Sequence, residues 1–257
     1  MVHRLRTESI RQFAAIRCAF AVAVAGAKGL SFVEALRDYT DLHRRTTGAI
    51  PGESATADVA WSGLAKQLTE ISDSQEALDC IVAFMSDSNL HRYDRSNSPY
   101  WPFRYDYHAT DHTIRMHFGT LKFYVNTEAE TPGLLSEVRL PELRAQLARM
   151  FREVSERYPL ARQVRGASWL YSRRSYCRVY PAAFTASPKI AEGRFQGGAR
   201  WGQFHTGQGR INSDLRDLFL NNIAHRLDPS RLEDAFPVQT WAVSAPIETF
   251  YREYGVA

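Results

Sequence analysis

Apolar residues recur at helical spacing through the first ninety residues of this 257-residue chain. Side chains three and four positions apart share one face of a helix. The first run with this spacing contains Ile10, Phe13, Ala14, Ile16 and Phe20, and it ends near two glycines at positions 26 and 29. It predicts an N-terminal amphipathic helix.

Three more helices are expected over residues 31–48, over residues 55–71 and from residue 73 onward. The first and last of these open with capping boxes, in which Ser31 precedes Glu34 and Asp73 precedes Glu76. We expect the four helices to pack antiparallel as a helical lobe over residues 1–93.

The pattern changes after DRSNSPYWP at positions 94–102, a cluster of turn formers that we interpret as a linker. Beyond it, partial alternation of β-branched and aromatic residues predicts strands, and amphipathic segments predict helices between them. Strands are expected over residues 112–125, 163–171, 193–205 and 239–243, and helices over 140–158, 173–184, 213–226 and the tail from 247. The sequence therefore predicts an α+β fold, in which the helical lobe precedes a mixed-sheet domain over residues 94–257.

The helix expected over residues 140–158 has the clearest amphipathic pattern in the chain. Its apolar face consists of Leu143, Leu147, Met150, Phe151 and Val154, and its arginines lie outside that face. We expect this face to pack on a sheet that contains residues 163–171.

Composition is that of a soluble globular protein, with 44% hydrophobic and 23% charged residues. Arginines before the run CAFAVAVAGA give it some likeness to a secretory signal, but Glu8 argues against this, and the run is too short to span a bilayer. The three cysteines, Cys18, Cys80 and Cys177, are widely spaced and indicate neither a disulfide framework nor a thiolate zinc site. We expect a cytoplasmic protein without a membrane partner.

The basic residues are almost all arginine, and the formal net charge is +4. Ten arginines lie between residues 136 and 178, against four glutamates and no aspartate. Such a local positive field suits a phosphate or carboxylate ligand, although a GC-rich genome would produce the same arginine bias without any function. The modest total charge argues against a nucleic-acid partner.

Aromatic residues, arginines and glycines concentrate between Gly166 and Arg210. Aromatic rings and guanidinium groups bind flat or anionic ligands, and glycine lets the backbone approach a ligand closely. Tyr176 and Tyr180 fall one helical turn apart and are expected to present their hydroxyls to one pocket, whereas Trp169 and Phe195 are assigned to the core. We expect this stretch to form a wall of a binding site.

Histidines and aspartates gather in YDYHATDHTIRMHF, at positions 105–118. Imidazole and carboxylate ligate zinc and non-haem iron, so the five groups Asp106, His108, Asp111, His112 and His117 form a candidate metal cluster, with His108, Asp111, His112 and His117 as the ligands of a metal-dependent enzyme. On a strand, however, His112 and His117 point to opposite faces, and no HExxH motif is present. The alternative is that these are surface and linker histidines, with no metal bound. His117 separately suits the role of a general base near neutral pH.

Two glycine-rich segments, GRFQGGARWG and HTGQGRINSD, offer backbone N–H groups to an anion. Gly207 and Gly209 precede the helix expected at Ser213, whose N-terminus would attract negative charge, and Arg200 and Arg210 would add positive charge. A hairpin turn followed by an ordinary N-cap explains the same residues. The chain has no nucleophile elbow, P-loop or dinucleotide-binding fingerprint, which disfavours three large enzyme classes.

From residue 115 onward the order of IRMHF, TPGLLSEVRLPELRAQLARMF, VRGASWLYSRRSYCRVYP, RFQGG and FPVQTWAVSAPIETFYREYG resembles the C-terminal GNAT-like domain of bacterial acyltransferase-type proteins. The resemblance covers a little over half of the chain and implies a GNAT-like sheet and an acyl-CoA donor. In that superfamily a loop of pattern R/Q-x-x-G-x-G/A holds the CoA pyrophosphate. The segment NTEAETPGLL, at the corresponding place, lacks this pattern, whereas Arg194, Gly197 and Ala199 fit it after a different strand. A fold does not dictate a function.

These observations favour transfer of an acyl or related group from an anionic, CoA-like donor to an amine of a small-molecule substrate. We expect a pocket walled by residues 115–123, 169–180 and 194–210. His117 would act as base and Tyr176 or Tyr180 as proton donor. The donor would contact Arg194, Gly197, Arg200, Trp201, Gly207, Gly209 and Arg210. The alternatives are a metal-dependent enzyme using the histidine cluster and a non-catalytic binding protein; substrate, oligomeric state and pathway are not specified by the sequence.

Overall fold

The computed structural model describes residues 2–49, 51–52, 54–87, 98–119, 133–186, 188–193, 195–206 and 210–256. Its contacts divide the chain into two compact units, each built from two segments. Unit 1 comprises Met1–Asp94 and Glu192–Pro237, and unit 2 comprises Arg95–Ala191 and Val238–Ala257. The first boundary lies one residue from the predicted one. Residues 192–237, which were expected in the second domain, belong instead to the helical unit.

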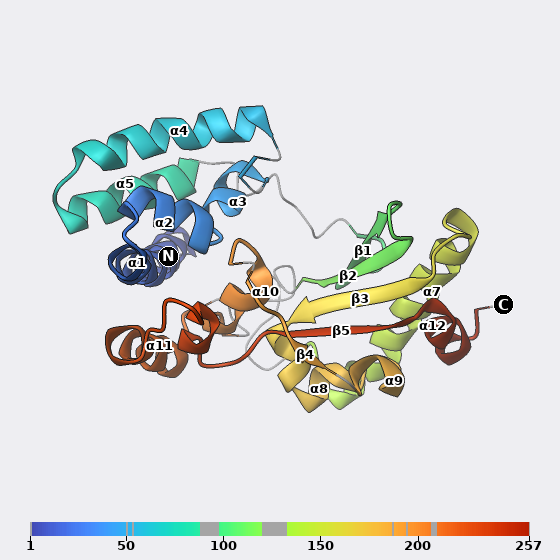
Figure 1. Cartoon of the computed structure of the whole chain (residues 1–257). Coiled ribbons are helices and arrows are strands. Elements are labelled where there is room, and N and C mark those ends of the chain that lie inside the picture. Colours follow the sequence, from blue (N-terminus) through green and yellow to red (C-terminus); the bar gives the residue numbers. More distant parts are fainter. Residues whose placement is uncertain are drawn as a thin grey trace. The chain divides into compact units, whose positions relative to one another are not determined.

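Unit 1 is helical (Figure 1). Its N-terminal segment forms α1 (Val2–Lys28), α2 (Phe32–Tyr39), α3 (Leu42–Thr47), α4 (Ala55–Glu70) and α5 (Ser74–Asp87). Its second segment forms α10 (Gly198–Trp201), the 3-10 turn η4 (Gly202–Phe204), α11 (Ser213–His225) and the 3-10 turn η5 (Leu232–Ala235).

The helix predicted over residues 31–48 forms as two helices with the predicted ends. The Ser31 hydroxyl accepts the N–H of Glu34 and the Glu34 carboxylate accepts the N–H of Ser31, which confirms the capping box. The helix is interrupted at Thr40, whose hydroxyl donates to the carbonyl of Leu36 and accepts the N–H of Leu42. α3 then ends at Gly48, where a φ of 83° requires the left-handed conformation that glycine adopts without strain.

The core of unit 1 forms where aromatic rings of its second segment pack on α1. The ring centroid of Phe20 lies within 5.8 Å of those of Phe195, Trp201, Phe219 and Phe236. The strand predicted over residues 193–205 is therefore wrong. Trp201 and Phe204 are both buried in this core, and residues three apart share one face in a helical turn but not in a strand.

One helix among the described residues, Glu8–Lys28 within α1, is long and apolar enough to cross a membrane by length and composition. Phe13, Ile16, Phe20 and Val24 of this helix are buried in the core of unit 1. The helix is therefore compatible with a soluble protein.

Unit 2 combines a five-stranded mixed sheet with short and long helices. The strands are β1 (Phe103–His108), β2 (Thr113–Phe118), β3 (Gln163–Ser168), β4 (Lys189–Ile190) and β5 (Trp241–Pro246), in the order β1-β2-β3-β5-β4. β2 and β3 pair in parallel, and the other neighbours pair antiparallel. The helices are η2 (Glu137–Arg139), α7 (Leu140–Arg157), η3 (Trp169–Ser172), α8 (Arg174–Cys177), α9 (Ala182–Thr185) and α12 (Ile247–Tyr254).

Helices cover one face of the sheet in unit 2; the other face, on which no described helix of this unit lies, is called the open face. α7, α8, α9 and α12 all lie on the same side of it (Figure 1). On that side Phe103, Ile114, Val164 and Val243 are buried in one cluster with residues of these helices. The opposite face carries polar side chains and is covered by no described helix of unit 2.

The amphipathic helix predicted over residues 140–158 is confirmed as α7. All five predicted core residues, Leu143, Leu147, Met150, Phe151 and Val154, are buried. The tail helix, the helix from residue 213 and the closing strand are also present as α12, α11 and β5. Together with the N-terminal helices and the mixed sheet, these elements confirm the α+β fold class.

Other boundaries in unit 2 were predicted wrongly. β1 lies between the predicted linker, which ends at Pro102, and the strand predicted from His112, and no strand was predicted there. β3 ends at Ser168, whose hydroxyl accepts the N–H of Leu170 at the start of a 3-10 turn. The helix predicted over residues 173–184 is interrupted near Pro181, which has no N–H to donate. Residues 120–125 of the predicted first strand lie outside the described residues.

Candidate functional site

The open face of the sheet in unit 2 gathers the charged residues of β1, β2 and β3. Side chains alternate along a strand, so Phe103, Tyr105 and Tyr107 take the covered side of β1 and the intervening residues take the open side. Arg104 of β1 pairs in register with His117 of β2, Asp106 pairs with Arg115, and Arg115 pairs with Arg165 of β3. These five residues, Arg104, Asp106, Arg115, His117 and Arg165, are called the open-face cluster below.

A histidine–aspartate dyad lies within this cluster. His117 Nε2 is 2.6 Å from Asp106 Oδ2, across the diagonal between the two antiparallel strands. The hydrogen bond from His117, together with the nearby charges of Arg104 and His108, holds the pKa of Asp106 at about 2. The His117 side chain is 28% exposed and that of Asp106 51% exposed, so both are accessible to a ligand.

Two arginines flank the dyad and share one nearby carboxylate, that of Asp106. Arg115 forms no hydrogen bond or ion pair with any described residue, and the buried Nε of Arg104 has no hydrogen-bond partner among them. Arg165 differs, because it binds Asp111 Oδ2 at 3.2 Å and Gln163 Oε1 at 2.8 Å. Arg115 and Arg165 are like charges opposite each other on neighbouring strands, which is unfavourable, and the carboxylates of Asp106 and Asp111 offset only two of the three arginine charges of the cluster. The cluster is therefore suited to a negatively charged ligand.

The candidate metal ligands do not converge. His112 Nδ1 lies 2.7 Å from the Tyr107 hydroxyl, Asp111 binds Arg165, and His117 binds Asp106. No group of three histidine, cysteine or acidic side chains that could hold a metal ion occurs in the part of the chain that the structure describes. His108 shares the open side of β1 with Asp106 but bonds none of the other candidates in this part of the chain.

Tyr176 and Tyr180 are core residues rather than pocket residues. They are 3% and 2% exposed, and the Tyr180 hydroxyl donates to that of Tyr176 at 2.7 Å. Burial raises the pKa of both phenols. The predicted role as proton donor to a substrate is corrected, because the two hydroxyls are hydrogen-bonded to each other inside the aromatic core of unit 2.

The residues expected to hold the donor belong to unit 1, so they do not share a unit with His117. Trp201 is fully buried, and its indole N–H donates to the carbonyl of Phe195 at 2.7 Å. The guanidinium of Arg200 lies 5.0 Å and 5.1 Å from the ring centroids of Phe195 and Phe236, and burial lowers its pKa. Both side chains therefore contribute to the core, and their predicted donor-binding role is corrected. Gly197 precedes the four-residue α10.

The predicted anion site before residue 213 is also corrected in part. The N-terminus of α11 is capped by Asn212, whose side chain accepts the N–H of Leu215 at 3.2 Å, and Asp214 adds a negative charge to the first turn. Arg210 is exposed, and its backbone N–H donates to the Thr206 hydroxyl at 3.1 Å. Arg194, Gly207 and Gly209 lie outside the described residues.

Most of the arginines between residues 136 and 178 already have partners. Acidic, amide, carbonyl or aromatic groups contact Arg139, Arg144, Arg149, Arg157, Arg165, Arg173 and Arg178. Ion pairs with acidic residues account for five of the ten, Arg139, Arg144, Arg157, Arg165 and Arg178, so the positive field predicted for this stretch is neutralised in part.

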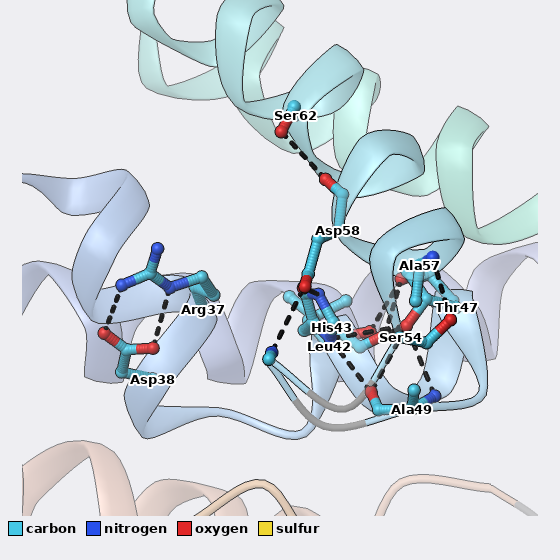
Figure 2. A network of polar contacts seen from close by, with 12 residues as sticks. Arg37, Asp38, Leu42, His43, Thr47, Ala49, Ser54, Ala57, Asp58 and Ser62 are labelled. Atoms are coloured by element: carbon cyan, nitrogen blue, oxygen red, sulfur yellow. Dashed lines mark hydrogen bonds and ion pairs between the residues drawn. The ribbon is translucent and has the colours of Figure 1, made fainter.

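A second histidine–aspartate contact, in unit 1, involves a fully buried histidine. Figure 2 shows His43 of α3 beneath Asp58 of α4, with Nδ1 bonded to the carbonyl of Ala49 at 2.9 Å. His43 Nε2 lies 3.3 Å from Asp58 Oδ1 without forming a hydrogen bond, and the His43 side chain is 0% exposed. These contacts join α3 to the start of α4.

Sequence reasoning identified His117 and placed Arg115 within the predicted pocket wall over residues 115–123, but it gave no role to Arg115 or Arg104 and missed the pairing of Asp106 with His117. Asp106 was considered as a metal ligand, and residues 103–108 were not recognised as a strand. The alternation in FRYDYH, with aromatic residues at odd positions and polar residues at even ones, was the available signal.

In comparisons with protein-family models, with curated proteins and with solved structures, nothing matches this chain. Its function is therefore inferred from the chemistry of the open-face cluster.

Proposed function

We propose that unit 2 transfers an acyl or related group from an anionic donor to an amine, at the open-face cluster and with His117 as general base. The observation that supports this most is the hydrogen bond between His117 and Asp106 beside Arg115, which bonds no described residue, and Arg104, whose Nε has no hydrogen-bond partner among them. A base, a group that orients it and an unneutralised positive charge are the parts that such a reaction needs.

The dyad supplies the proton chemistry. When His117 is neutral and Nε2–H donates to Asp106, the lone pair resides on Nδ1. As the amine nitrogen bonds to the transferred group, its proton passes to Nδ1. The bond between that group and the donor breaks, and its electron pair stays with the donor. The imidazolium then returns the proton to the leaving group, so no tyrosine is required.

Asp106 favours this cycle because it remains charged. Its pKa of about 2 keeps the carboxylate ionised through the neutral range, where it stabilises the imidazolium and fixes the ring orientation. General base catalysis of this kind contributes typically ~10²–10⁴-fold to a rate.

Arg104 and Arg115 supply electrostatic stabilisation. Arg104 is opposite His117, and Arg115 is opposite Asp106, so the two arginines lie on either side of the diagonal that joins His117 and Asp106. Guanidinium groups bind phosphate and carboxylate by charge-assisted hydrogen bonds, and they favour negative charge that develops on a leaving group. An acyl-CoA or an acyl phosphate would supply the activated group and the anion. The GNAT resemblance agrees with such a donor and stays a prediction.

The test is a transfer assay with acetyl-CoA and acetyl phosphate as donors and a panel of primary amines as acceptors. We expect His117→Asn to lower the rate by about 10²–10⁴-fold, the typical contribution of a general base. His225→Asn, at an exposed histidine of α11 in unit 1, is the matched control and should leave it unchanged. Absence of turnover with both donors, or full activity of His117→Asn, would remove this function.

A further inference from the structure

We infer that unit 1 holds a second anion site, independent of the proposed transferase function, formed by Arg17, Arg45 and His205 and suited to the carboxylate of a small organic acid. Arg17 belongs to α1, Arg45 to α3, and His205 follows η4. The residues come from three separated parts of the chain, and none of them contributes to the open-face cluster.

A buried ionic network forms the base of this site. Asp41 accepts hydrogen bonds from Arg17 through Oδ1 and from Arg45 through Oδ2. The side chains of Arg17 and Asp41 are each 1% exposed, whereas that of Arg45 is 32% exposed. Burial alone would raise the pKa of Asp41, but the two guanidinium groups hold it at about 2. Two positive charges thus share one negative charge, and the excess is one positive charge.

Arg17 has a donor that the network leaves unused. Its Nε binds Asp41 and its Nη1 donates to the carbonyl of Phe13 at 2.7 Å. Its Nη2 is buried and has no hydrogen-bond partner among the described residues. Buried donors in folded proteins are almost always satisfied, so an acceptor belongs at Nη2. The positive excess favours an acceptor that carries negative charge.

Aromatic rings fix the geometry around this donor. The Arg17 guanidinium lies 4.9 Å from the ring centroid of Trp201, which leaves its edges available for hydrogen bonding. The third residue of the site, His205, stacks its ring on that of Phe13 at a centroid distance of 3.6 Å. Burial, with the charges of Arg45 and Arg17, lowers the pKa of His205 well below its usual range, so the ring is neutral and offers one N–H.

The charge of the network selects the ligand class. A monoanion neutralises the excess of one positive charge, whereas a dianion such as sulfate would leave a surplus negative charge in a desolvated site. Arg45 and His205 are both partly exposed, so the network reaches the surface of unit 1 at these two side chains. In the inferred complex the carboxylate accepts from the unused Nη2 of Arg17 and from Arg45, and the rest of the acid lies toward the exposed side chain of Arg45.

The test is an NMR titration of the full chain with sodium formate, in which sodium sulfate is lowered to keep ionic strength constant. The imidazole resonances of His205, assigned with His205→Gln, should shift and saturate. Arg45→Gln keeps the Arg17–Asp41 pair and should weaken formate binding about tenfold or more. Arg11→Gln is the matched control, since Arg11 pairs with Asp79 in the same unit, and it should bind as the wild type does.

Two results would overturn the inference. One is a His205 spectrum that does not respond to formate in the wild type. The other is an equal response in Arg45→Gln. Thermal unfolding gives a second readout that needs no variant: formate several-fold above its dissociation constant should raise Tm saturably by about 2–4 °C, and the absence of a saturable rise also counts against the site.

Discussion

Replacing Gly166 by alanine should destabilise unit 2, because the position has no room for a side chain. A Cβ built on Gly166 would lie 2.1 Å from the Tyr171 hydroxyl oxygen and 3.0 Å from its Cζ. Sequence reasoning expected glycines in this stretch to let the backbone approach a ligand. Here the glycine lets a tyrosine of the core approach the backbone of β3.

The tyrosine cannot move aside cheaply. Its ring centroid lies 5.1 Å from that of Tyr176, 6.0 Å from that of Tyr180 and 5.9 Å from that of Phe184. Overpacking of a well-packed core costs typically about 1–3 kcal/mol. At about 1.4 kcal/mol per factor of ten, this change lowers the folding equilibrium constant roughly 5–150-fold.

Urea unfolding followed by tryptophan fluorescence measures this cost, since Trp169 and Trp241 report on unit 2. Gly26→Ala is the matched control: nothing lies within 4 Å of a Cβ there, and alanine should stabilise α1 by about 0.5–1 kcal/mol. Adding Tyr171→Phe to Gly166→Ala removes the 2.1 Å contact and should recover part of the loss. A Gly166→Ala protein as stable as the wild type would refute the close packing of β3 against Tyr171.

Three further predictions concern stability and organisation. Leu147→Asp places a carboxylate at a 0% exposed position of α7, and its cost of several kcal/mol should leave little soluble, cooperatively folding protein, as circular dichroism would show. The lowered pKa of Asp106 means that this carboxylate stabilises the folded state fully above its unfolded pKa of about 3.9 and that the stabilisation is lost as pH falls toward 2. The contribution is below about 1 kcal/mol because the side chain is half exposed. A carboxyl NMR titration of Asp106 with a midpoint near 4 would contradict the dyad. Limited proteolysis should cut first within residues 94–102, beside the boundary between the two units at Asp94 and Arg95, and mass spectrometry of the first fragments checks this.

The sequence predicts elements well where one local signal decides them. The apolar face of α7, the capping box at Ser31 and the left-handed Gly48 each depend on residues a few positions apart, and all three are observed. Prediction failed where distant contacts decide. Residues 198–204 turn helically because Trp201 packs against Phe20 of α1, about 180 residues earlier in the chain, and Phe204 is buried in the same cluster. No local pattern encodes these contacts.

The candidate site shows the same division. His117 was selected for its chemistry alone, but its partner Asp106 and the flanking Arg104 depend on the antiparallel register of β1 and β2, which places residues 11 to 13 positions apart side by side. Conversely, Tyr176, Tyr180, Arg200 and Trp201 have side chains that suit a ligand. Burial in two aromatic cores assigns them to packing instead.

The most direct measurement is an NMR titration of the wild-type chain with pyrophosphate, which follows the histidine ring nitrogens and the arginine Nε–H groups. If the open-face cluster binds the anionic donor, the His117, Arg104 and Arg115 resonances should shift and saturate together, with His117 protonated at Nε2, and Arg115→Gln should weaken binding about tenfold or more. Shifts confined to Arg210 or to other residues of unit 1, or no saturable shift at all, would contradict a donor site on this sheet.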